Sequence, residues 1–128
     1  MTEKYIDIAD NWGVVVCYDL KRLDEYEMRQ NMIVFGMRGS RLDEAVEVLL
    51  DRENTGMCIS RSDIRMSLVF IGNATGTEQF WDTCIHEMYH VACAIGDYYN
   101  VPYDSEDFAW LMGYLMRKLV LLIGEPCV

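Results

Sequence analysis

A hydrophobic run rich in β-branched and aromatic residues spans residues 12–18. It predicts a strand that is buried on both faces. Two shorter runs, at residues 57–60 and 66–72, predict two more strands with a turn between them. Residues 1–11 are polar and mixed, and no strand is expected there. The pattern therefore predicts a short sheet of about three strands.

Elsewhere the hydrophobic residues recur with the helical period. A helix is predicted over residues 21–36, with Gly36 near its end. A second helix follows Ser40, which is expected to cap it. The core positions of this second helix follow an i, i+3, i+4, i+7 spacing: Leu42, Ala45, Val46, Leu49 and Leu50.

Two longer helices are predicted in the second half of the chain. The first covers residues 78–98, with Thr77 as its N-cap. The second begins after a cap at Asp104 or Ser105 and is stopped by Gly124 and Pro126. Its expected core positions are Phe108, Leu111, Met112, Leu115, Leu119 and Leu122. Strands and helices together predict an α+β fold, packed as a single domain over residues 1–128.

The helix over residues 78–98 is predicted to have two different faces. Its expected core stripe is Ile85, Met88, Ala92 and Ile95. Residues with chemically active side chains lie on another face: His86, His90, Cys93 and Asp97. Glu87 falls at the edge between the two. One side of this helix can therefore pack while the other side carries ligands.

Residues 86–90 spell the motif H-E-x-x-H, and they hold both histidines of the chain. On a helix, His86 and His90 lie one above the other, so that their imidazoles can bind one Zn²⁺ ion. Glu87 is placed to take a proton from a zinc-bound water. The alternative is a helix that carries two histidines near the surface without a metal.

Charge and composition narrow the possible partners. The chain has 128 residues and a net charge of −10. Binding to nucleic acid or to an anionic membrane requires clustered Lys and Arg, so neither is expected. The acidic balance favours solubility or a basic partner. No run of 18 uncharged apolar residues is present, and no membrane span is predicted.

The chain has five cysteines: Cys17, Cys58, Cys84, Cys93 and Cys127. Their number is odd, their spacing forms no C-x-x-C pair, and no leader segment is recognised. Reduced thiols and a cytoplasmic location are expected.

A catalytic zinc usually has three protein ligands and a water. No third histidine exists, and the candidates are Cys93, Asp97, Asp104, Glu106 and Asp107. Cys93 is about one turn too far along the helix, and Asp97 is farther still. Glu106 begins the next helix, which a turn at residues 100–103 can fold back. Ala109 then forms an E-x-x-A step with Glu106, and its small side chain is expected to let the two helices approach closely.

This order of elements resembles the minimal gluzincin-type zinc metallopeptidases of the zincin class. Small zinc peptidases of bacteria and their phages are similar in size and order. The resemblance covers about residues 66–115 and implies a zincin-like domain. In that domain, zinc is held by His86, His90 and Glu106, and Glu87 is the general base. Asp107 and Asp104 stay open as alternatives to Glu106, with Cys93 behind them.

The resemblance also implies a substrate. In the zincins, an edge strand beside the motif helix pairs with an extended peptide. Residues 66–72 are the candidate strand, although their apolar run also fits an interior strand. The expected function is therefore a zinc-dependent metallopeptidase that acts on a peptide or protein. The alternative is an inactive zinc-binding scaffold that inhibits or binds a partner through its acidic surface.

Overall fold

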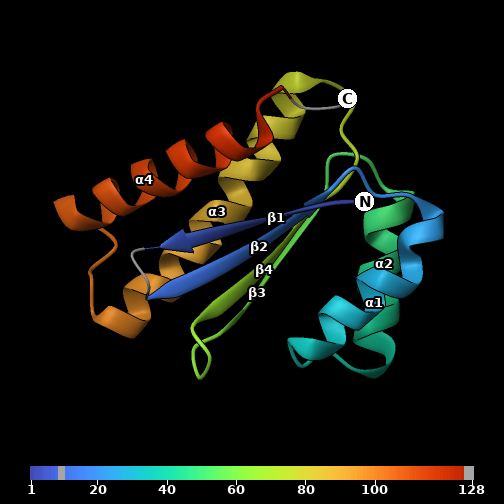
Figure 1. Ribbon diagram of the computed structural model, residues 1–128, viewed down its shortest axis with the longest axis horizontal. Coiled ribbons are helices and arrows are strands. Elements are labelled where there is room, and N and C mark those ends of the chain that lie inside the picture. Colours follow the sequence, from blue (N-terminus) through green and yellow to red (C-terminus); the bar gives the residue numbers. More distant parts are fainter. Residues whose placement is uncertain (9–10, 126–128) are drawn as a thin grey trace.

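The computed structural model describes residues 1–8 and 11–125. Within them, the chain forms one mixed sheet and four α-helices, and the predicted α+β class is confirmed (Figure 1). The elements are β1 (Thr2–Ile8), β2 (Trp12–Tyr18), α1 (Glu25–Val34), α2 (Gly39–Asp51), β3 (Gly56–Arg61), β4 (Met66–Ile71), α3 (Thr77–Tyr99) and α4 (Glu106–Ile123). A short 3₁₀ turn, Arg22–Asp24, leads into α1.

The sheet has four strands in the order β1-β2-β4-β3, one more than predicted. The additional strand is β1, which pairs antiparallel with β2. Most residues of β1 are exposed or half-buried, and only Ile6 and Ile8 reach the core. A polar edge strand of this kind has a weak hydrophobic signal, which explains why the sequence did not reveal it.

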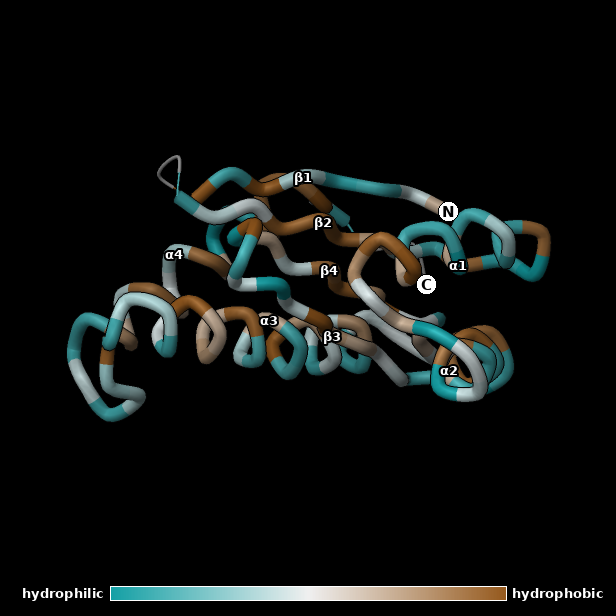
Figure 2. Tube along the Cα trace, turned by 90° about the horizontal axis from the view of Figure 1, so that it is seen from below, coloured by the Kyte–Doolittle hydropathy of each residue, from teal (hydrophilic) through white to brown (hydrophobic). Residues whose placement is uncertain are grey.

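Helices cover both faces of the sheet. Figure 1 shows α3 and α4 on one face and α1 and α2 on the other. Val14 and Val16 of β2 pack with α3 and α4, whereas Cys17 packs with α1 and α2. Figure 2 shows hydrophobic residues along β2, which lies between β1 and β4. This explains the continuous hydrophobic run of β2, which is buried on both faces as predicted.

The positions of β3 and β4 decide which strand is accessible. β4 lies between β2, to which it is parallel, and β3, to which it is antiparallel. The prediction that residues 66–72 form an edge strand is therefore wrong, and their interior alternative is confirmed. The two edge strands are β1 and β3, and α3 packs directly against β3.

Several helix ends differ from the prediction. α2 begins at Gly39, so Ser40 lies inside the helix and makes no capping bond. α3 begins at Thr77 itself, after Gly76. In α4, the Ser105 hydroxyl accepts a hydrogen bond from the Phe108 N–H, which confirms Ser105 as the cap.

Some of the buried positions of α3 and α4 also differ from those predicted. Ile85 is half exposed at 49%, and Cys84, Val91 and Phe80 are buried instead. In α4, Leu122 is exposed. Ala109 is exposed as well, so the predicted role of Ala109 in close helix packing is wrong.

Gly96 of α3 makes its closest approach to the turn that follows α3. A Cβ atom there would lie 3.0 Å from the Val101 carbonyl oxygen, and at an ordinary contact distance of 3.4 Å from the Phe108 ring of α4.

The last points about the fold concern the C-terminal end of the chain and the length of the helices. The predicted stop at Pro126 and the thiol of Cys127 lie outside the described residues. α4 does end before Gly124, which has a φ of 67°. None of the helices within residues 1–8 and 11–125 combines the length and hydrophobicity that a membrane crossing requires.

Candidate metal centre

The two histidines of the motif lie one turn apart on α3 and are both exposed. The His86 Nε2 and His90 Nε2 atoms are 3.4 Å apart. Two nitrogens bound to one tetrahedral zinc at about 2.0–2.1 Å are separated by about 3.3–3.4 Å. The pair therefore has the separation that a shared zinc ion requires.

Glu87 lies between α3 and β3. Its side chain is almost fully buried, whereas sequence analysis placed it at the edge of the packing face. Glu87 Oε1 is 3.7 Å from His86 Nε2. Glu87 Oε2 is buried and has no hydrogen-bond partner among the described residues. An unsatisfied buried carboxylate oxygen is costly, and a ligand or water that donates a hydrogen bond to it would remove that cost.

Burial raises the pKa of the Glu87 carboxyl, and the nearby His86 and His90 oppose that effect. A carboxyl group whose pKa is raised is a better proton acceptor than an ordinary surface carboxylate. His86, Glu87 and His90 together place their potential ligand atoms within 4.8 Å of one another.

Gly56 allows β3 to approach α3 closely at this point. A Cβ atom at Gly56 would lie 2.8 Å from Glu87 Cγ and 2.7 Å from Thr83 Cγ2. Both distances are too short for real contacts, so a larger residue would displace the Glu87 side chain. The sequence pattern did not identify Gly56 as part of the site. A glycine at the start of a strand was the available signal, because it often marks close approach of a backbone.

A groove runs between α3 and β3 in front of this centre, and we call it the α3–β3 groove. It is lined by Gly56, Met57, Cys58 and Ser60 of β3 and by Glu87, His90, Cys93, Ala94 and Asp97 of α3. Two neighbouring hollows continue it along the same elements. One reaches Asp82 and His86, and the other reaches Ser62 and Tyr98.

The predicted third ligand is not brought together with the histidines. Glu106 and Asp107 are exposed in the first turn of α4, and Asp104 is exposed just before it. Within the described residues, none of these joins the group formed by His86, Glu87 and His90. Glu106 as the third ligand therefore stays a prediction.

Cys93 and Asp97 do face the α3–β3 groove but are also outside the ligand group. Asp97 accepts a hydrogen bond of 2.6 Å from the Tyr103 hydroxyl. That bond raises the pKa of Tyr103. Asp97 is thus engaged in holding the turn between α3 and α4.

Comparisons with protein-family models, with curated proteins and with solved structures returned no match. The function of the centre is therefore inferred from its geometry and chemistry.

Proposed function

We propose that this protein is a zinc-dependent metallopeptidase, with His86 and His90 as zinc ligands and Glu87 as general base. The observation that carries the proposal is the pair of Nε2 atoms 3.4 Å apart above a buried carboxylate with one unpartnered oxygen. Two surface histidines that bind no metal would not explain why a glutamate is buried beside them. A zinc site in which Glu87 is the general base does explain it.

When bound there, zinc acts as a Lewis acid that polarises a peptide carbonyl and makes water more acidic. Glu87 accepts the proton of the attacking water and passes it to the leaving amine. Its burial keeps competing water away from that proton, and its raised pKa suits both the acceptance and the release.

The open edge of β3 supports a peptide as the substrate. Gly72 N–H donates to Thr55 C=O at 2.7 Å, so alternate residues from Thr55 onward bond to β4. The residues between them, Gly56, Cys58 and Ser60, turn their N–H and C=O groups toward the open edge. These three residues also line the α3–β3 groove. An extended peptide that pairs with β3 would therefore lie beside Glu87.

We also propose that the fold is zincin-like and that Glu106 completes the metal site. Phe108, two residues after Glu106, packs edge-on against Tyr89 with ring centroids 6.0 Å apart. Since Tyr89 precedes His90, the first turn of α4 lies beside the turn of α3 that carries a ligand. The cytoplasm is the compartment we propose, because the four described cysteines are free thiols.

The test begins with zinc content and affinity. We expect one zinc per chain, and strong loss of affinity in His86→Ala and in His90→Ala. Glu87→Gln should keep the metal and abolish cleavage of a peptide library. Wild-type protein that binds no zinc would contradict the proposal.

The third ligand is tested by a matched pair of variants. Glu106→Ala should weaken zinc binding by about tenfold or more, whereas its neighbour Asp107→Ala should not. The reverse result would assign the ligand to Asp107. If neither variant changes the affinity for zinc, Asp104 and Cys93 are the next candidates for the third ligand.

A second function is favoured by the absence of a third ligand from the compact group of described residues. On this alternative, the chain binds zinc without catalysis and acts as an interaction or inhibitor protein through its acidic surface, with a net charge of −10. Zinc-loaded protein that cleaves no peptide, and that behaves identically with Glu87→Gln, would favour it.

A further inference from the structure

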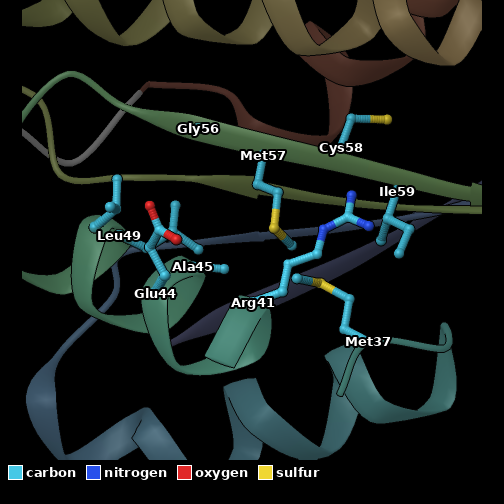
Figure 3. Close-up of a pocket in the computed structure, with 10 residues that line it drawn as sticks. Met37, Arg41, Glu44, Ala45, Leu49, Gly56, Met57, Cys58 and Ile59 are labelled. Carbon is cyan, nitrogen blue, oxygen red and sulfur yellow. The ribbon is translucent and has the colours of Figure 1, made fainter. Parts of the chain in front are cut away.

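A second groove lies on the other side of β3, between β3 and α2, and we call it the α2–β3 groove. Figure 3 shows Met37, Arg41 and Glu44 facing Met57 and Ile59 across it. Its volume is about 310 Å³. That volume falls in the range of sites that take a small ligand or a side chain.

The α2–β3 groove and the α3–β3 groove meet at β3 and share Gly56, Met57 and Cys58. Side chains alternate along β3. Cys58 packs with α3 and the metal-centre side of the sheet, whereas Met57 and Ile59 pack with the α1 and α2 side. The open edge of β3 is thus bordered by one groove on each face of the sheet.

A peptide paired with this edge would have the same alternation. Its odd side chains would point to the α3–β3 groove and its even side chains to the α2–β3 groove. Residues that reach the α2–β3 groove would therefore be two positions apart in the peptide. The α2–β3 groove would then contact side chains of the peptide that do not face the metal centre.

The lining of the α2–β3 groove indicates which side chains fit. Met37, Met57 and Ile59 form an apolar surface, and methionine adapts to ligand shapes. Arg41 is exposed and forms no ion pair within the part of the chain that the structure describes. Glu44 lies nearer Leu49, at the other end of the groove, whereas the Arg41 guanidinium lies between Met57 and Ile59 (Figure 3).

We propose that the α2–β3 groove is a specificity site for a peptide paired with β3. It takes an apolar side chain and, two residues away, an acidic side chain that pairs with Arg41. The choice of a peptide as the occupant rests on the proposed peptidase function. The predicted pattern of an apolar and an acidic side chain does not rest on that function, because it follows from Arg41 and from the alternation of side chains along β3.

The test uses three blocked heptapeptides: TLTETLT, TLTKTLT and TSTETST. The full-length chain carries Glu87→Gln, so that no cleavage occurs, and binding is followed by amide NMR with and without zinc. We expect TLTETLT to bind about threefold to fivefold more tightly than TLTKTLT, the size of one exposed ion pair. TSTETST should bind more weakly than TLTETLT. The net charge of −10 favours the lysine peptide, so nonspecific attraction cannot produce this order.

Arg41→Glu should reverse the preference between TLTETLT and TLTKTLT. Arg52→Glu is the matched control, because Arg52 is an exposed arginine after the end of α2 and does not line the groove. It should leave the preference unchanged. The amides of Gly56, Cys58 and Ser60 should shift with every peptide that binds.

Equal affinities for the glutamate and lysine peptides would overturn the inference, as would a preference that Arg41→Glu leaves intact. Binding of no peptide would overturn it too. A failure of the proposed metal centre is recognised separately, because the wild-type chain would then bind no zinc. If the Arg41-dependent preference persists in such a chain, the groove is a peptide site and the peptidase proposal alone is lost.

Discussion

Glu87 depends on a single glycine for its position. Gly56→Ala would place a Cβ atom 2.8 Å from Glu87 Cγ and 3.0 Å from the Phe70 carbonyl oxygen. Because β3 or the glutamate must move, we expect a loss of about 1–3 kcal/mol in the free energy of unfolding. Zinc-dependent cleavage should fall at least tenfold. Urea unfolding and a peptide assay measure the two effects.

The matched control for this variant is Gly113→Ala. Gly113 lies inside α4, and a Cβ atom there meets nothing within 4 Å. Alanine is a better helix former than glycine by about 0.5–1 kcal/mol, so this variant should be slightly more stable and equally active. Equal behaviour of the two variants would show that Gly56 has no special role.

Cys17 links stability to alkaline pH. Its thiol is fully buried, and burial raises its pKa from 9.0 to about 12, with the negative charge of Glu3 as the next cause. Below pH 9 the thiol is protonated in both the folded and the unfolded chain, and its contribution is complete. Between pH 9 and 12 only the unfolded chain loses the proton, so stability falls as pH rises, by about 1.4 kcal/mol per pH unit.

Cys17→Ala removes this ionisable thiol. The difference in the free energy of unfolding between wild type and Cys17→Ala should be constant below about pH 8 and should shift in favour of the variant above pH 9. Urea unfolding at pH 7, 8, 9.5 and 10.5 measures it. Parallel pH profiles for the two proteins would contradict the assignment.

At the scale of elements, two serines near helix starts differ in role. Ser105 accepts a hydrogen bond from the Phe108 N–H at the start of α4, whereas Ser40 lies within α2 without a capping bond. Ser105→Ala should cost about 1 kcal/mol of unfolding free energy, and Ser40→Ala should be close to neutral. Chemical denaturation of both variants measures this. A loss at Ser40 equal to that at Ser105 would restore the cap predicted from sequence.

The two faces of α3 perform different tasks. Met88, Val91 and Ala92 are fully buried and fix the helix on the sheet, while His86 and His90 remain exposed. Because the packing face holds the helix without the histidines, metal-site variants should remain folded. Loss of zinc affinity in such variants can then be attributed to the ligands themselves.

At the scale of the whole molecule, zinc should stabilise the fold. An ion that binds only the folded chain adds about 2.7 kcal/mol at a free concentration 100 times its Kd. We expect zinc to raise the Tm of the wild type and a chelator to reverse this, with no change in His90→Ala. Magnesium is the control, since imidazole ligands suit it poorly. An unchanged Tm with zinc would contradict the metal site.

The sequence predicted the core elements well where the hydrophobic signal was strong. The strand at residues 12–18 and the core positions of α2 (Leu42, Val46 and Leu49) are as expected. β1 was missed because only two of its residues are buried. Ile85 was misplaced because its exposure depends on how α3 is rotated on the sheet, which periodicity alone defines only to within a residue.

The sequence alone determined the α+β class, the helix that carries H-E-x-x-H, and the identity of His86, Glu87 and His90 as the candidate centre, because those features are local. Only the tertiary structure decided that β3, rather than β4, is an open edge of the sheet and that a groove lies on each side of it. It also showed that the missing side chain of Gly56 leaves the space in which Glu87 is buried. Strand order and the contact between a strand and a helix are long-range choices, and no spacing within one segment encodes them.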